Sequence, residues 1–294
     1  MMNDQANNLR RALQQQSQRE PKKTRVLSVI SGKGGVGKSN FSLNFSLALA
    51  QAGKKVVLFD LDIGMANLDI LLGLNTTYDV VDMVENDNTI WDIMEEGPLG
   101  LQIVAGGSGL SDIFEMTASK KERFSRQMDL LDGAFDYIIF DMGAGATADS
   151  LNFILSSHET IVITTPEPTS ITDAYAMLKH LHIQDSTLPS SILVNRAESE
   201  KEGNHTAENL QRVAQQFLKK NISVLGSIPQ DKHVLQAVKR QEPFYLAYPS
   251  CKASKALQLC LDTFVDESED KHSGRGGEFQ RFMGQLKTFL TGGR

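Results

Sequence analysis

The sequence has few of the features that build covalently cross-linked or membrane-spanning proteins. Its two cysteines, Cys251 and Cys260, cannot form a disulfide scaffold, and their spacing does not match a zinc pattern. No stretch reaches the about 18 consecutive apolar residues that a bilayer-spanning helix needs. The N-terminus lacks the apolar core of a secretory signal. We therefore expect a reduced protein of the cytoplasm.

Composition indicates a globular chain whose ends differ from its body. Of the 294 residues, 40% are hydrophobic and 22% are charged, which excludes a disordered protein. The formal net charge of −6 gives no reason to expect a nucleic-acid partner. The segments 1–25 and 268–294 are nevertheless basic, whereas the body is acidic. This pattern indicates either separate tasks for the ends or simple solubilising tails.

Short apolar runs alternate with helix-length amphipathic patterns along the body of the chain. Alternation of this kind predicts an α/β fold with a doubly wound, mainly parallel sheet and helices on both faces. Helices are expected at 40–52, 119–131, 170–182 and 206–220. Strands are expected at 26–30, 56–59, 101–104, 136–141, 160–164, 191–195 and 223–225.

A glycine-rich loop, GKGGVGKS at 32–39, joins the first predicted strand to the first predicted helix. It matches the phosphate-loop pattern G-x-x-x-x-G-K-S in the expected context. Glycines allow backbone N–H groups to converge on phosphate oxygens, and the helix N-terminus adds its dipole. Lys38 would neutralise the β- and γ-phosphates, and the Ser39 hydroxyl would ligate Mg²⁺. The predicted nucleotide-binding residues are Gly32, Lys33, Gly34, Gly35, Val36, Gly37, Lys38, Ser39 and Asn40.

Lys33 is an additional cation that a phosphate loop does not require. By itself it could be a solvated lysine. The whole motif, however, resembles the deviant Walker A motif of the MinD/ParA family of ATPases. That resemblance implies that Lys33 is catalytic in trans, reaching the nucleotide of a partner subunit. It also implies that the active species is an ATP-bound homodimer with slow intrinsic hydrolysis.

Two carboxylates follow the second predicted strand, in the sequence DLDIGMANLD. The carboxyl end of a strand in an open parallel sheet faces the ligand crevice. A carboxylate there can orient a water molecule or hold the hydration shell of Mg²⁺, although one of the two could instead hold the loop. By resemblance to the second MinD motif, Asp62 positions the attacking water and Asp60 lies near the metal.

A third aspartate, Asp141, begins DMGAG at the end of a later predicted strand. This segment resembles the switch II motif of the family, usually D-x-P-x-G, which implies a water-mediated contact from Asp141 to Mg²⁺. Gly143 replaces the proline and should make the loop freer in φ and ψ.

The segment after the strand at 191–195 indicates adenine rather than guanine recognition. A guanine site would carry N-K-x-D, whereas 195–198 read NRAE. Asn195 could hydrogen-bond an adenine edge and Arg196 could stack on the ring; Asn195 could equally be a strand-end turn residue. The V-N-R sequence resembles MinD, and IPQD at 228–231, with Pro229, resembles its second adenine-side loop. ATP and ADP are therefore the expected nucleotides.

The segment 278–290, EFQRFMGQLKTFL, predicts an amphipathic helix after a linker at 268–277. Its apolar stripe could lie in an anionic membrane interface, pack on its own domain, or alternate between the two. One such helix binds lipid weakly, whereas the two of a dimer bind much better. MinD also carries a C-terminal membrane-targeting helix. The predicted membrane residues are Phe279, Phe282, Met283, Leu286, Phe289 and Leu290.

The N-terminal segment DQANNLR at 4–10 matches the D-Q-A-x-x-L-R segment of the FlhG, or YlxH, group of MinD-like flagellar ATPases. That resemblance implies binding to the GTPase FlhF and stimulation of its GTP hydrolysis, with Gln5 near the attacking water. Components of the flagellar basal body or C-ring are further possible partners. A tail without a target is the alternative. The predicted partner-binding residues are Asp4, Gln5, Ala6, Leu9 and Arg10.

Together these patterns divide the chain into a tail at 1–24, a MinD-like ATPase domain at 25–267, the linker and a terminal helix at 278–294. The expected function is an ATP-dependent switch that binds the inner membrane surface reversibly and regulates flagellar number or placement. Alternatives are a division-site or plasmid-type positioning ATPase, and a nucleotide-stabilised interaction protein without a hydrolytic cycle. A metal-cluster carrier is disfavoured because the two cysteines are not arranged for a cluster.

Overall fold

A central sheet organises the protein, for which a computed structural model describes residues 24–62, 68–73, 77–105, 117–145, 147–271 and 278–291. The strand order is β3-β4-β2-β5-β1-β6-β7-β8, and the pairs are parallel except β3 with β4. The strands are β1 Arg25–Ser31, β2 Val56–Leu61, β3 Met94–Glu96, β4 Gln102–Val104, β5 Tyr137–Ala144, β6 Glu159–Thr164, β7 Ser190–Ala197 and β8 Ser223–Pro229.

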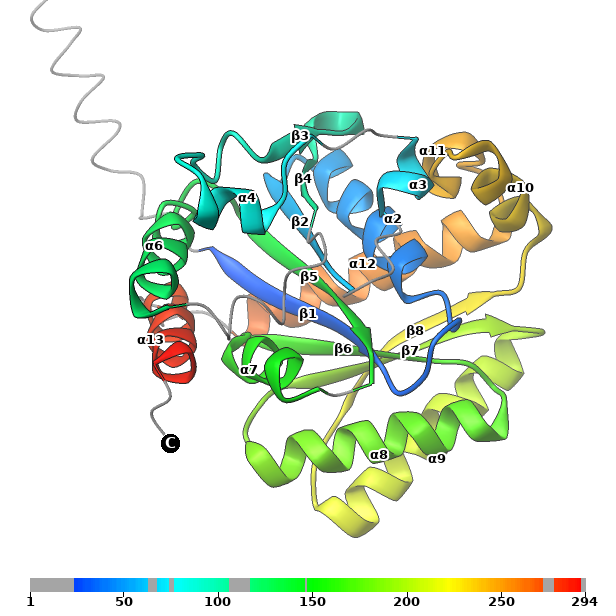
Figure 1. Ribbon diagram of the computed structural model, residues 1–294. Helices are drawn as coiled ribbons and strands as arrows, with labels where there is room; N and C mark the ends of the chain where they lie inside the picture. The colour runs from blue at the N-terminus through cyan, green and yellow to red at the C-terminus, as the bar shows by residue number, and fades with distance from the viewer. Residues whose placement is uncertain are drawn as a thin grey trace, which may run out of the picture.

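Helices cover both faces of this sheet (Figure 1). Helices α6, α7, α8, α9 and α13 contribute to one hydrophobic cluster, and α2, α10, α11 and α12 to the other. The predicted doubly wound fold is therefore confirmed. The helices are α2 Lys38–Gln51, α3 Leu68–Leu72, α4 Val80–Glu85, η1 Pro98–Gly100, α6 Ala118–Asp129, α7 Ala148–Ser156, α8 Pro168–Gln184, α9 Glu200–Leu218, α10 Lys232–Arg240, α11 Phe244–Ala247, α12 Lys252–Lys271 and α13 Glu278–Leu290.

Strand β1 illustrates why the central strands read as unbroken apolar runs. Val26 and Ile30 belong to one cluster, whereas Leu27 and Val29 belong to the other. Successive side chains of a strand point to opposite faces, and both faces of this sheet are covered by helices. Each apolar residue of the strand therefore has a core to enter.

Several boundaries differ from the sequence-based expectations. The antiparallel edge strand β3 was not predicted, because its sequence MEE has no apolar alternation. Helix α12 continues to Lys271, so it crosses the expected boundary between the ATPase domain and the linker at 267 and 268. Residues 272–277 of that linker lie outside the described residues, as does the tail segment at 4–10 with its proposed partner-binding side chains.

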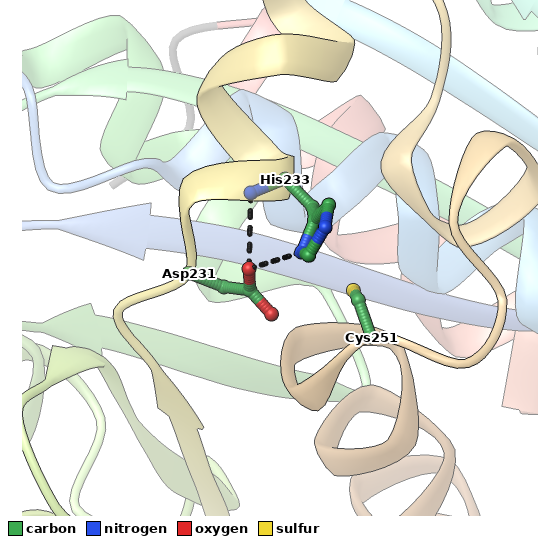
Figure 2. Close-up of side chains that lie close together, drawn as sticks. All are labelled: Asp231, His233 and Cys251. Carbon is green, nitrogen blue, oxygen red and sulfur yellow. Dashed lines mark hydrogen bonds and ion pairs between the residues drawn. The ribbon is translucent and has the colours of Figure 1, made fainter.

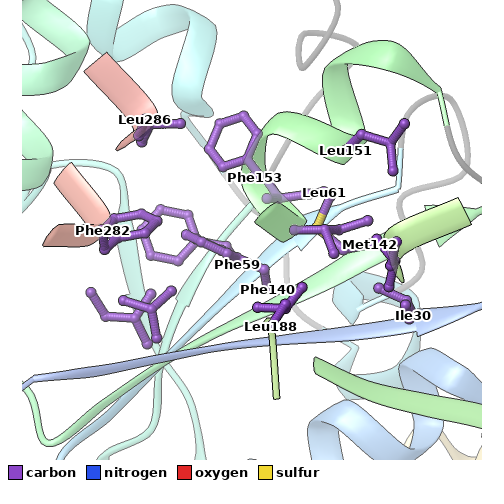
Figure 3. Packing of buried hydrophobic residues seen from close by; sticks show 14 of the residues in the cluster. Ile30, Phe59, Leu61, Phe140, Met142, Leu151, Phe153, Leu188, Phe282 and Leu286 are labelled. Carbon is purple, nitrogen blue, oxygen red and sulfur yellow. The ribbon is translucent and has the colours of Figure 1, made fainter. Parts of the chain in front are cut away.

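Helix α13 packs on its own domain. Its stripe is almost fully buried apart from Phe289, which is half-buried. The ring centroids of Phe282 and Phe140 lie 5.9 Å apart, and Figure 3 shows Phe282 and Leu286 beside Phe140 and Phe153. Lys287 Nζ lies 2.9 Å from Asp129 Oδ2 of α6. Of the two environments expected for the apolar stripe, a membrane interface and the protein's own domain, the stripe therefore occupies the second in this conformation.

Apart from Phe289, the membrane-facing residues predicted from the sequence are thus core residues here, and a membrane role would require α13 to undock from its own domain. The helix is too short to do more than lie in an interface. Among the described residues, no helix has both the length and the hydrophobicity that crossing a bilayer requires.

Candidate nucleotide-binding site

The phosphate loop connects the end of β1 to the start of α2, and packing explains two of its glycines. A Cβ atom at Gly32 would lie 2.3 Å from the backbone of Asp173 in α8. One at Gly37 would lie 2.4 Å from Asn195 Nδ2, and the φ of Gly37 is 90°, in the left-handed region that favours glycine. The loop is therefore held closely from two sides, and the N-terminus of α2 is available to a phosphate.

Lys38 is buried and lies among acidic and hydroxyl groups. Its Nζ donates to Asp141 Oδ1 at 3.0 Å and lies 3.9 Å from Asp62 Oδ2. Ser42, one helical turn after Lys38, donates from its hydroxyl to the same Asp141 oxygen at 2.8 Å. In the sheet, Asp60 of β2 is in register with Asp141 of β5. The carboxyl ends of the central strands thus bring together the lysine and the carboxylates predicted for this site.

The second oxygen of the Asp141 carboxylate has a different environment. Asp141 is fully buried, and its Oδ2 has no hydrogen-bond partner among the described residues. A buried carboxylate oxygen of this kind requires a partner such as water or a metal ion. Ser39, half-buried in the first turn of α2, supplies a hydroxyl oxygen. These hard oxygen donors fit Mg²⁺ with its retained water ligands.

Asp62 is the more accessible carboxylate of the site. Burial raises its pKa, the charge of Lys38 opposes that shift, and the charge of Asp141 adds to it. A Cβ atom on Gly143 would lie 3.1 Å from Asp62 Oδ1. The glycine that replaces the expected switch II proline therefore lies directly against the carboxylate predicted to position the water.

Asp60 holds the loop after β2, which was one of the roles expected for Asp60 or Asp62. Its Oδ1 accepts the backbone N–H of Asp62 at 3.1 Å, and its Oδ2 accepts that of Leu68 at 3.2 Å. These bonds hold the two described ends of the segment after β2. A contact from Asp60 to the hydration shell of Mg²⁺ stays a prediction.

A pocket of about 400 Å³ lies beside the phosphate loop, where a nucleotide base would fit. Asn195, Arg196 and Pro229, the three residues predicted for the base side of the nucleotide, line it. Asn195 Nδ2 donates to Val36 O at 2.8 Å, while Asn195 Oδ1 accepts the backbone N–H of Arg196 at 3.0 Å. Asn195 therefore ties the phosphate loop to the base side of the site. Its predicted contact with adenine stays untested.

The opposite wall of this pocket was not singled out from the sequence. It is formed by α10 and α11, with Val234, Leu235, Val238 and Phe244. An apolar wall suits the faces of a purine ring. In the sequence, the apolar residues of α10 recur at helical spacing directly after IPQD, and this periodicity is the signal that could have indicated the wall.

Lys33 lies at the rim of the site. Its Nζ donates to Glu167 Oε2 at 2.6 Å and to Thr169 Oγ1 at 3.0 Å, both at the start of α8. The hydrogen bond from Lys33, together with its charge, lowers the pKa of Glu167. Glu167 was missed because no motif marks it, although it follows the carboxyl end of β6. Ser42 could have been found from its i+4 spacing to Lys38.

These features define a P-loop nucleotide-binding protein. They are a mainly parallel sheet, a glycine-rich loop at a helix N-terminus, a buried lysine and clustered carboxylates. The family model described as CobQ/CobB/MinD/ParA nucleotide binding domain matches residues 27–244. The chain belongs to this family.

Relatives agree with this assignment. The chain is similar to the antiactivator FleN of Pseudomonas aeruginosa, at 35% identity over 79% of this chain and 83% of FleN. It is also similar to the flagellum site-determining protein YlxH of Helicobacter pylori, at 31% identity over 84% of this chain and 83% of YlxH.

Solved structures show the same fold. The MinC:MinD cell division protein complex of Aquifex aeolicus has a chain with a TM-score of 0.66 and 26% identity, covering 82% of this protein and 96% of that chain. MinD of Pyrococcus horikoshii with Mg-ADP has a TM-score of 0.67 at 23% identity, covering 85% and 99%. The protein is a nucleotide-binding ATPase of the MinD/ParA type.

Proposed function

We propose that this ATPase is a switch that dimerises with ATP and regulates the number or placement of bacterial flagella. The observation that carries the dimer is Lys33, which lies at the rim of the nucleotide site and is held there by side chains of the surface. From this position its amine can exchange Glu167 for the phosphates of a second subunit. The flagellar assignment is supported by the similarity to FleN and YlxH and by the DQANNLR tail.

The hydrolytic step follows from the geometry of the carboxylates. Lys38 would leave Asp141 to neutralise the β- and γ-phosphates, while Ser39 and Asp141 would hold Mg²⁺. Bound Mg²⁺ supplies neutralisation of phosphate charge. Asp62, which lies close to Lys38, would orient the attacking water. The arrangement therefore provides charge neutralisation and positioning, the main requirements of phosphoryl transfer.

Membrane attachment would depend on the release of α13. Five of its apolar side chains are buried. Burial of each contributes about 1.5–3 kcal/mol, so undocking into water would cost on the order of 10 kcal/mol. Transfer of the same stripe into a lipid interface offsets that cost, and two helices on one dimer add avidity.

A physical path joins the nucleotide site to this helix. Phe140 packs against Phe282 of α13, and the next residue of β5 is Asp141, which contacts Lys38. Helix α7, which follows β5, also packs against α13. A shift of β5 on binding of the γ-phosphate would therefore change the seat of α13.

The tail would provide the partner specificity. We propose that residues 4–10 bind FlhF and accelerate its GTP hydrolysis, with Gln5 at the nucleotide. A peptide of residues 1–20 should raise the GTP turnover of FlhF, and a Gln5→Ala peptide should not. An inactive wild-type peptide would remove the FlhF role and leave the ATPase cycle untouched.

Size-exclusion chromatography of the full chain tests the switch. With ATP and Mg²⁺, Asp62→Ala should elute as a dimer that persists, because hydrolysis no longer resets it, whereas ADP should leave a monomer. Asp262→Ala, which removes an exposed aspartate of α12, is the matched control and should behave as wild type. An Asp62→Ala protein that stays monomeric with ATP would overturn the proposal. Equal membrane and FlhF binding with ADP and ATP would favour an interaction protein without a cycle.

A positioning ATPase for cell division is the second candidate. The chain is 30% identical to the septum site-determining protein MinD of Bacillus subtilis over 88% of this chain and 98% of MinD. The tail discriminates between the two functions, since it is the segment that resembles the flagellar group. A strain lacking residues 1–20 should lose flagellar control and retain normal septum placement.

A further inference from the structure

Three side chains of the kinds that bind metals converge where α10 and α12 begin (Figure 2). They are the carboxylate of Asp231, the imidazole of His233 and the thiol of Cys251, and one ligand atom from each lies within 4.8 Å of the others. Asp231 Oδ1 and His233 Nδ1 are 2.8 Å apart. Cys251 comes from the turn before α12, so the tertiary fold creates this cluster.

We propose that this Asp231–His233–Cys251 cluster binds a zinc-class divalent ion and is separate from the Mg²⁺ position at the phosphate loop. Zn²⁺ takes thiolate, imidazole and carboxylate ligands, whereas Mg²⁺ prefers oxygen alone. Tetrahedral Zn²⁺ places its ligand atoms roughly 3.3–3.8 Å apart. The three atoms are close enough to reach that spacing by side-chain rotation. A fourth position would remain for water.

Backbone N–H groups already hold two of the three side chains. Asp231 accepts the N–H of His233 at 2.9 Å and that of Ala253 at 3.3 Å, while Cys251 Sγ accepts the N–H of Ser254 at 3.4 Å. The carboxylate and the sulfur are therefore positioned by the backbone before any metal binds.

The imidazole is oriented from the other side. The ring centroids of His233 and Tyr248 lie 4.9 Å apart. An aromatic neighbour and a carboxylate together restrict the rotation of the ring, as outer-shell partners do in metal sites. The three ligands thus come from the starts of two helices, and the Tyr248 ring packs against one of them.

Loading balances charge and protons. The Cys251 thiol would release its proton as the metal–sulfur bond forms, and His233 would coordinate through a neutral ring nitrogen. Thiolate and carboxylate then offset the two positive charges of the ion. Because Asp231 also lines the base pocket, the ion would fix one wall of that pocket to the start of α12.

The other cysteine provides an internal comparison. Cys260 is buried within α12, and burial raises the pKa of its thiol to about 12. A thiol that stays protonated is a poor metal ligand. Because the chain has two cysteines, a thiolate–metal signal can be assigned to one of them by substitution.

Co²⁺ titration of the metal-free, full-length protein in excess Mg²⁺ tests the site. The expected result is one equivalent of bound Co²⁺ with a thiolate-to-cobalt charge-transfer band, which Zn²⁺ displaces. Cys251→Ser should abolish the band, and His233→Gln should weaken binding by roughly tenfold or more. Two control variants should retain the band, namely Cys260→Ala and His205→Gln, the second of which changes an exposed histidine.

Thermal unfolding guards against misfolded variants. Zn²⁺ should raise the Tm of wild type and Cys260→Ala, and should leave that of Cys251→Ser unchanged. The absence of a thiolate band in wild type, or its persistence in Cys251→Ser, would overturn the proposal. In that case the three side chains form a helix-capping network only. Neither result depends on ATP hydrolysis or dimerisation, so the proposed switch is tested separately.

Discussion

Lys33 Nζ lies 2.6 Å from Glu167 Oε2 of its own chain, although its motif implies a role at the nucleotide of a second subunit. In the monomer, Lys33 thus forms an ion pair with an exposed carboxylate, and a phosphate group could replace that carboxylate as its partner. The pKa of Glu167 is lowered chiefly by this hydrogen bond, so it reports where Lys33 is.

We predict that the pKa of Glu167 rises toward its ordinary value when Lys33 moves to a partner's phosphates. NMR titration of the Glu167 carboxyl should show the lowered pKa in the ADP-bound monomer and a higher one in the ATP-bound Asp62→Ala dimer. Lys33→Ala in the monomer sets the reference for a free Glu167. An equally low pKa in monomer and dimer would mean that Lys33 never leaves.

A second prediction concerns Gly143, whose Cβ would lie 3.1 Å from Asp62 Oδ1. Gly143→Ala should push the Asp62 carboxylate by a few tenths of an ångström. Because misplacing a catalytic group by about 1 Å can cost 10²-fold, we expect ATP turnover to fall about tenfold. Affinity for fluorescent ADP should not change, since Asp62 is not expected to hold the nucleotide.

Phosphate release and nucleotide titration measure the two effects of Gly143→Ala. Gly284→Ala in α13 is the matched control, because a Cβ there meets no atom within 4 Å. Unaltered turnover in Gly143→Ala would show that the position of Asp62 is not limiting.

The parts of the site that could be predicted are those written in contiguous sequence. The phosphate loop, with Lys38 and Gly37, is one segment, and its neighbours in β2 and β5 could be placed because parallel strands end at one edge of a sheet. The strands themselves were predictable because both faces are covered, which makes each an apolar run.

What could not be predicted depends on packing between distant segments. Glu167 reaches Lys33, and Cys251 reaches Asp231, only because of the strand order and the turns between elements. The cysteine spacing gave no zinc pattern for the same reason. The stripe of α13 was visible as an apolar face, but periodicity does not tell whether protein or lipid covers such a face.

A third prediction follows from the raised pKa of Asp62. A carboxyl whose pKa is raised by folding contributes stability below its unfolded pKa, and that contribution is lost as pH rises through the folded value. Folding of the nucleotide-free protein is therefore less favourable with an ionised Asp62 than with a neutral side chain at this position. Asp62→Asn should raise the Tm at pH 7 while abolishing hydrolysis.

Measuring the Tm of wild type and Asp62→Asn across pH checks the sign. The increase in Tm caused by Asp62→Asn should shrink toward about pH 4, near the ordinary pKa of aspartate, where Asp62 is protonated. In wild type, hydrolysis should decline on acidification earlier than an ordinary aspartate would require. A lower Tm for Asp62→Asn at neutral pH would contradict this account and indicate that its attraction to Lys38 outweighs burial.

The last prediction separates the docked and released states of α13. Phe153→Leu alters the seat of the helix on α7 and leaves the apolar stripe of α13 intact (Figure 3). A swap of this size in a core costs about 1 kcal/mol, which is about fivefold in a docking equilibrium. Liposome co-sedimentation with ADP should therefore rise severalfold for Phe153→Leu.

Two controls accompany this measurement. Phe217→Leu, the same change at an exposed position of α9, should have no effect, and deletion of 278–294 should remove binding in every background. Because the stripe itself is unchanged, increased binding would indicate weaker docking of α13. Binding of Phe153→Leu that stays at the wild-type level would show that α13 is a permanent part of the core, and binding that survives the deletion would show that α13 is not the membrane anchor.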